Sequence, residues 1–183
     1  MKLRRRTFRE WCVIADHAKG IDDLDLKSMH RPLVVSGHTT PENLDSLTMG
    51  QMVTFSQAKA DWGLFYIICN ELLGMDGDET ADADAAEVVM FCGWVIGRLE
   101  EVNKLLQGVS VQHTSEQMRA GIDRLNFGVF GLIDWYARRM GITDHDEVLK
   151  VPVLRVYQCL KMDKEQQEYE NRLAKVIRGE RKK

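Results

Sequence analysis

The side chains best suited to chemistry lie in an acidic stretch, residues 76–87, that follows the spacing of a calcium-binding loop. Counted from Asp76 to Glu87, side-chain oxygens stand at positions 1, 3, 5, 7, 9 and 12, where such loops turn ligands inward around a hard cation. Position 6 is Ala81 instead of the glycine that the sharp turn needs. We therefore favour an acidic connection between helices and expect no metal and no cofactor, with a calcium-binding helical module as an alternative.

Other catalytic patterns are weak. Ser56 and Lys59 have the spacing of a serine–lysine nucleophile pair, but the SDN and KTG motifs that accompany it are absent. The five histidines form neither an HxxxH pair nor an HExxH motif, and no GxxxxGK[ST] phosphate loop occurs. The four cysteines form no CxxC pair and stand among apolar residues, as small buried hydrophobes do. We predict that the protein is not an enzyme.

Both ends of the chain are basic, although the formal net charge is −3. Such clusters can contact DNA phosphates or an acidic protein face. The negative net charge excludes a globally basic nucleic-acid binder, so a DNA-contacting packaging factor is an alternative that we do not favour. The terminal cations are Lys2, Arg4, Arg5, Arg6, Arg9, Arg178, Arg181, Lys182 and Lys183.

Length and hydropathy fit a globular protein without a membrane segment. The chain has 183 residues, 44% hydrophobic and 29% charged, which is enough for one domain with a core. Its longest apolar runs, 62–75 and 88–97, are shorter than the roughly 20 residues that span a bilayer. Carboxylates at Glu10 and Asp16 interrupt any secretory signal after the basic start. We expect a cytosolic protein.

Apolar periodicity predicts an all-α protein, a compact bundle of five or six helices with an N-terminal arm and a long charged C-terminal helix. Residues 1–46 are expected to form the arm, with a short helix near 8–15 and a brief strand at 33–35, and to add little to the core. Residues 47–183 are expected to form the helical domain. Its expected helices open near residues 49, 62, 82, 115, 144 and 153, with a break near 127–128.

Several helix ends carry their own sequence signals. Asp61 is expected to cap the helix that ends at Leu73, and Gly74 to terminate it. Thr143 is expected to cap the short helix that ends at Leu149, and Pro152 to start the final helix. Beyond residue 160 the final helix is thinly apolar and heavily charged. We predict that this end projects from the core and leaves one apolar stripe free for a partner.

The order of several segments along the chain is informative beyond any single motif. The segments are Leu47-Thr-Met-Gly-Gln-Met-Val-Thr-Phe-Ser-Gln57, Phe127-Gly-Val-Phe-Gly-Leu-Ile-Asp134, Ile142-Thr-Asp-His-Asp-Glu-Val-Leu-Lys-Val-Pro152, Val156-Tyr-Gln-Cys-Leu-Lys161 and Glu168-Tyr-Glu-Asn-Arg-Leu173. Over about residues 47–175, this order is similar to that of small helical proteins encoded in the structural modules of tailed bacteriophages, especially tail assembly chaperones.

The resemblance implies a non-enzymatic protein that binds other phage structural or tail proteins in the host cytoplasm during assembly. The alternative is a stoichiometric virion component, such as a head–tail connector, and a homo-oligomer is left open. The family offers no catalytic residues to transfer. From the residues themselves, we predict contact surfaces on the basic head and the final helix. The predicted partner-binding residues are Arg4, Arg5, Arg6, Trp11, Tyr157, Tyr169, Leu173 and Ile177.

Overall fold

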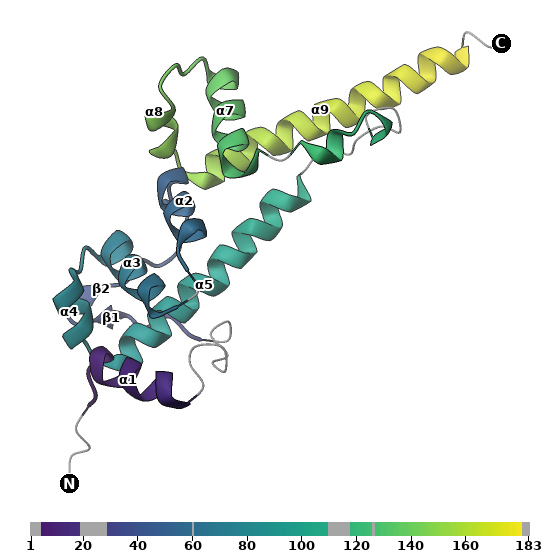
Figure 1. Cartoon of the computed structure of the whole chain (residues 1–183). Helices are drawn as coiled ribbons and strands as arrows, with labels where there is room; N and C mark the ends of the chain where they lie inside the picture. Colours follow the sequence, from purple (N-terminus) through teal and green to yellow (C-terminus); the bar gives the residue numbers. More distant parts are fainter. Residues whose placement is uncertain (1–4, 19–28, 60, 110–117, 126, 181–183) are drawn as a thin grey trace. The chain divides into compact units, whose positions relative to one another are not determined.

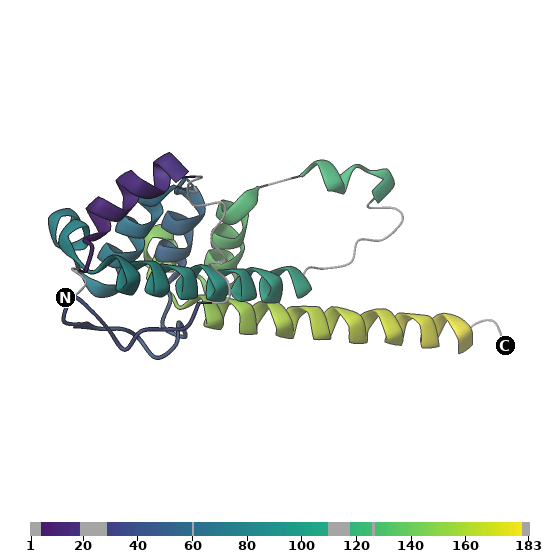
Figure 2. The same cartoon turned by 90° about the horizontal axis from the view of Figure 1, so that it is seen from below.

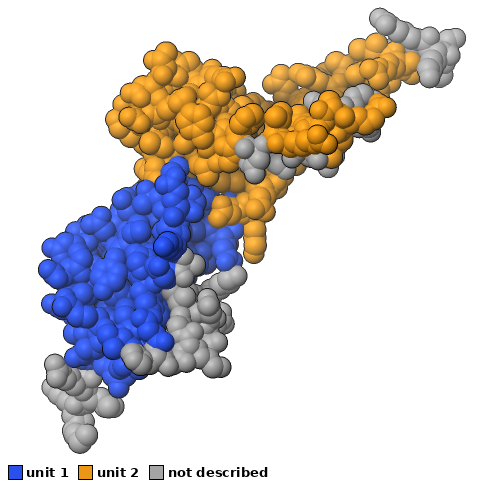
Figure 3. All heavy atoms as spheres, viewed as in Figure 1, with its two compact units in different colours: residues 1–44, 51–102 blue, residues 45–50, 103–183 orange. Residues whose placement is uncertain are grey.

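The chain is mostly helical and divides into two compact units. The computed structural model describes residues 5–18, 29–59, 61–109, 118–125 and 127–180 (Figure 1). The expected all-α class is confirmed. Unit 1 contains residues 1–44 and 51–102, and unit 2 contains residues 45–50 and 103–183 (Figure 3). This division differs from the boundary expected at residue 46, since the chain enters unit 2 briefly at 45–50 and then returns to unit 1.

The described residues contain eight α-helices, one short 3-10 helix and one two-stranded sheet. The strands form an antiparallel hairpin in which Val34 pairs with Thr39 and Val35 with His38. There are more helices than the five or six expected, partly because α4 is separate from α5. The helices are α1 (Phe8–Ala18), α2 (Met49–Gln57), α3 (Trp62–Leu73), α4 (Gly77–Asp82), α5 (Ala85–Gly108), η3 (Ile122–Arg124), α7 (Gly128–Met140), α8 (His145–Leu149) and α9 (Val153–Glu180); the strands are β1 (Val34–Val35) and β2 (His38–Thr39).

The ends of α3 follow the sequence signals. The Asp61 carboxylate accepts a hydrogen bond from the Gly63 N–H at 2.8 Å, which satisfies one of the amides left free at a helix start. Gly74 ends the helix with φ of 70°, a left-handed conformation that favours glycine. Both expected caps of α3 are therefore confirmed.

Two other helices begin slightly further along the chain than expected, and the predicted cap Thr143 is wrong. Asp82 is the last residue of α4, and Asp84 caps α5 by accepting hydrogen bonds from Ala86 N at 3.0 Å and Glu87 N at 3.3 Å. Asp144, not Thr143, caps α8 by accepting from Asp146 N at 2.9 Å. In both places a carboxylate one or two residues further along reaches the free first-turn amides.

The head of the chain is part of the core of unit 1. Phe8 is 0% exposed, and its ring stacks on Phe65 with 5.7 Å between centroids. Phe8 N donates to Ala83 O at 2.9 Å, and Ala85 N donates to Arg6 O at 3.0 Å, so the backbone is also fixed. The expectation that the head adds little to the core is wrong for these residues, since the Phe8 ring packs against aromatic side chains of α3.

In unit 2, the backbone near residues 47–49 pairs with the backbone at the start of α9. Met49 N donates to Val151 O at 2.9 Å, and Val153 N donates to Leu47 O at 2.8 Å. The backbones come so close that a Cβ on Gly50 would lie 3.1 Å from the Leu149 carbonyl oxygen. Beyond this pairing, α9 continues as one helix past α7 of the same unit (Figures 1 and 2).

Replacing Phe8 tests the role of the head. We expect Phe8→Ala to lower the free energy of unfolding by about 3–5 kcal/mol, because it leaves a cavity in a packed core. Phe8→Leu, which keeps most of the volume, should cost less than about 1.5 kcal/mol. Urea unfolding followed by circular dichroism measures both.

The matched control is Phe130→Ala, because Phe130 on α7 is 60% exposed. Its ring lies 5.2 Å from the His145 ring between centroids, so the change should lower stability by no more than about 1.5 kcal/mol. Equal effects of Phe8→Ala and Phe130→Ala would show that the head does not contribute to the core.

Candidate functional site

The acidic stretch 76–87 builds helix starts and does not form a calcium loop. Asp76 caps α4, with its carboxylate accepting from Glu79 N at 2.8 Å. The carboxylates of Asp78 and Asp82 lie 3.3 and 3.6 Å from the Arg9 guanidinium of α1. In the part of the chain that the structure describes, no group of three or more histidine, cysteine, aspartate or glutamate side chains is placed to hold a metal. The physical reason is α4 itself, because a helix across the middle of the stretch prevents alternate side chains from converging.

Two of the cysteines form a buried thiol pair. Cys69 Sγ and Cys92 Sγ are 3.9 Å apart, both side chains are 0% exposed, and neither is in a disulfide. Burial, with the neighbouring Cys69, raises the pKa of Cys92 well above its ordinary value. A thiol that stays protonated is a poor nucleophile, so this pair packs the core, as expected for small buried hydrophobes.

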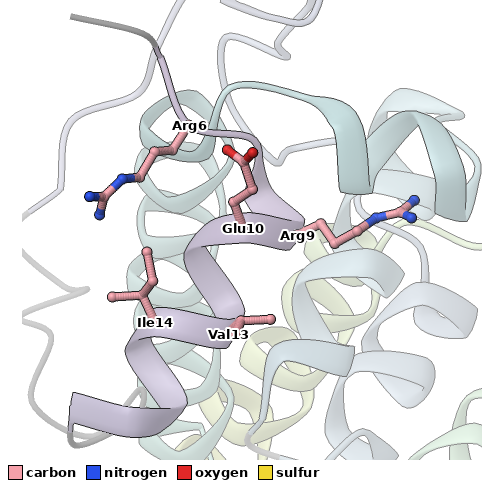
Figure 4. Close-up of a pocket in the computed structure, with 5 residues that line it drawn as sticks. All are labelled: Arg6, Arg9, Glu10, Val13 and Ile14. Carbon is pink, nitrogen blue, oxygen red and sulfur yellow. The ribbon is translucent and has the colours of Figure 1, made fainter.

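The first candidate surface lies on α1 and the residues just before it. Arg6, Arg9, Glu10, Val13 and Ile14 line a shallow hollow of about 590 Å³ (Figure 4). Figure 4 shows Arg6 and Ile14 projecting on one side of α1, with Arg9 pointing away from them. Val13 is 59% exposed. The surface therefore places the Arg6 cation beside apolar Ile14, a combination that suits an acidic amphipathic segment of another protein.

The predicted head residues have different roles in unit 1. Arg5 is exposed and lies 3.6 Å from both the Asp84 and Glu87 carboxylates. Trp11 is half-buried, with its ring against Trp62 at 4.7 Å between centroids, so part of it belongs to the core. Arg6 is exposed at the hollow. The other head residue predicted to bind a partner, Arg4, lies outside the described residues.

A capping box positions this surface, and the sequence prediction missed it. Glu10 N donates to Thr7 Oγ1 at 3.3 Å, and Thr7 N donates to Glu10 Oε2 at 3.2 Å. The Thr7-Phe-Arg-Glu10 sequence is the known signature of this motif, so the signal was available. It fixes where α1 begins and hence which of its side chains face outward.

The second candidate surface lies on α9 in unit 2. Tyr157 is half-buried and lines a hollow of about 340 Å³ with Val109 of the same unit. Tyr169, Leu173 and Ile177 are exposed, as is every side chain from 168 to 179. The sequence pattern places Tyr169, Leu173 and either Val176 or Ile177 on this surface; Val176 and Ile177 are both exposed, and so is Met162, which the prediction missed.

No protein-family model, curated protein or solved structure matches this chain. Among the described helices, none is long and apolar enough to cross a membrane.

The Cys12 thiol of α1 provides a test of the electrostatics at the first surface. Burial and then the nearby Asp16 carboxylate raise the pKa of Cys12 from 9.0 to about 11. Both effects disfavour the thiolate, so alkylation by iodoacetamide at pH 8 should be about 100-fold slower in the folded chain than in urea. Peptide mass spectrometry over a time course measures the rates.

The pH dependence of the alkylation rate distinguishes a raised pKa of Cys12 from reduced access of the reagent to the thiol. In the folded chain the rate should keep rising up to about pH 11, whereas in urea it should level off near pH 9. Asp16→Asn should accelerate the reaction at pH 8. Parallel pH profiles for the folded and unfolded chains would contradict the raised pKa.

Proposed function

We propose that this chain is a non-enzymatic assembly protein of a tailed bacteriophage, similar in role to tail assembly chaperones, that acts through protein–protein contacts in the host cytoplasm. The observation that carries the contact function is the exposed apolar face of α9. It contains Tyr169, Leu173 and Ile177 among charged neighbours. Grouped exposed apolar side chains rimmed by polar residues are typical of protein interaction sites.

The surface on α1 is a second observation that supports the proposed contact function. Arg6 stands on the same side of α1 as exposed Ile14, and exposed Val13 lines the same shallow hollow. An acidic helix with an apolar stripe would satisfy both the charge and the apolar area. The exposed side chains of Val13 and Ile14 are not needed to form the core of unit 1, because other residues, including Phe8 and Phe65, form that core.

The phage assignment itself depends on the similarity of the segments between residues 47 and 175 to tail assembly chaperones. The described parts of these segments contribute α2, α7, α8 and α9, which are helices as the resemblance implies. The resemblance supplies no catalytic residues, in keeping with a protein whose activity is binding.

Mass spectrometry of infected cells tests the proposal. In cells infected by the phage that encodes the chain, we expect it to co-purify with a tail protein from the lysate and to be absent from purified virions. Arg6→Glu should lower the co-purified tail protein by about tenfold or more, because a reversed charge faces the acidic partner.

The matched control is Arg178→Glu, an equal charge change at an exposed position of α9. It should leave the capture unchanged. A fixed copy number in virions would contradict the chaperone role and support a stoichiometric virion component. The absence of any phage protein among the captured partners would contradict both.

A further inference from the structure

The exposed apolar side chains of α9 form a stripe along one face, which Gln166 interrupts between Met162 and Tyr169. Successive residues of an α-helix are rotated by about 100°, so the members of the stripe fall within an arc of about 100° and extend over about 22 Å of helix. Each is between 42% and 61% exposed. The members are Met162, Tyr169, Leu173, Val176 and Ile177.

Other faces of α9 are engaged by unit 2. Asp163 Oδ1 lies 3.0 Å from the Arg139 guanidinium of α7. Lys164 Nζ donates to Gly108 O, the last residue of α5, at 2.8 Å. Both residues lie well away from Met162 on the helical wheel, which leaves the stripe side open. The open side continues toward the start of α9, where Arg155 and Gln158 are exposed.

The charge on α9 changes sign along the stripe. Residues 161–170 carry two lysines and four carboxylates, whereas residues 171–180 carry three cations and one carboxylate. Two helices in parallel would set acidic halves against each other and basic halves against each other. Two helices in antiparallel orientation would set each acidic half against a basic half.

The same complementarity holds at the edge of the stripe. Glu165 and Arg172 are seven residues apart, so they flank the same edge two turns from each other. Within the helix they pair only loosely, with Lys161 and Glu168 respectively, both at 3.9 Å. Exposed pairs of this kind contribute little, and both side chains are exposed, with Glu165 among the residues that line the hollow beside Gly108 and Val109. Both charges can therefore engage a second helix.

We propose that the stripe of α9 binds a second copy of this chain, with the two α9 helices antiparallel about a two-fold axis. Glu165 of each copy then lies opposite Arg172 of the other. In the same register, Met162 of each copy packs near Leu173 of the other. A two-fold contact of this kind uses one self-complementary patch twice.

The pairing is expected to be reversible. Stable interfaces bury at least about 1,200 Å² in total, and five apolar side chains per copy on one helix give a modest contact. The dimer fraction should therefore rise with protein concentration. It should fall with added salt, because the edge charges are exposed to solvent.

This inference rests on the proposed function in taking α9 as a contact surface, and it names the partner of that surface. The surface on α1 stays available for a different protein. A monomeric chain that still captures a tail protein would overturn the inference alone, whereas a dimer that captures no phage protein would overturn the proposed function alone.

Sedimentation equilibrium of the full chain over a wide concentration range tests the pairing. We expect a monomer–dimer equilibrium with the wild-type chain. The double variant Tyr169→Ser and Leu173→Ser should raise the dimer dissociation constant at least tenfold without altering the circular dichroism spectrum, because both side chains are exposed. The control variant Asn171→Ser and Ala174→Ser, on other exposed positions of α9, should leave it unchanged.

Charge exchange tests the antiparallel orientation. Glu165→Arg and Arg172→Glu should each weaken self-association several-fold, and the chain carrying both changes should recover it. An equimolar mixture of the two single variants should form heterodimers in preference to either homodimer. Arg178→Glu, on the side of α9 away from the stripe, should weaken self-association less than Arg172→Glu, because it changes the charge of the basic half by the same amount but removes no contact at the edge of the stripe.

Three results would overturn the proposal. The first is a chain that is monomeric at every concentration. The second is a dimer that the Tyr169 and Leu173 changes do not weaken, which would place the interface elsewhere. The third is a dimer whose single charge variants do not prefer each other, which would contradict the antiparallel pairing.

Discussion

The need of helix starts for hydrogen-bond acceptors determines how this chain uses its acidic residues. The first amides of an α-helix have no partner within the helix, and Asp61, Asp76, Asp84 and Asp144 each supply one. Four short connections can therefore turn directly into helices. A carboxylate committed to a first-turn amide is not free to surround a cation, so the richest cluster of acidic residues serves architecture.

The parts of the fold that local interactions determine were predictable from the sequence. Asp61 and Gly74 act on residues within one turn of themselves, and both caps of α3 were identified correctly. The start of α5 is different, because its capping residue Asp84 also forms an antiparallel bridge with Thr7. Such a contact joins residues far apart in the sequence, and no local pattern reports it. The burial of Phe8 was missed for the same reason.

The same difference between local interactions and contacts distant in the sequence applies to the candidate surfaces. The charged and thinly apolar composition of α9 predicted that its end would be exposed, and periodicity predicted the stripe. On α1, periodicity could not distinguish the inner aromatic side from the outer Val13 and Ile14, since which side is buried depends on α3, α4 and α5. The thiol pair of Cys69 and Cys92 was also invisible in the sequence, because it is created by the packing of α3 on α5.

The pairing of residues 45–50 with the start of α9 has a consequence for the order of events on the ribosome. Leu47 and Met49 are synthesised early, but their backbone partners, Val153 and Val151, are made more than one hundred residues later. Unit 1 has all its segments once residue 102 has emerged. Unit 2 must wait until residue 153 has left the exit tunnel, so the buried side chains of Leu47 and Met49 lack their final neighbours until more than one hundred further residues have been made.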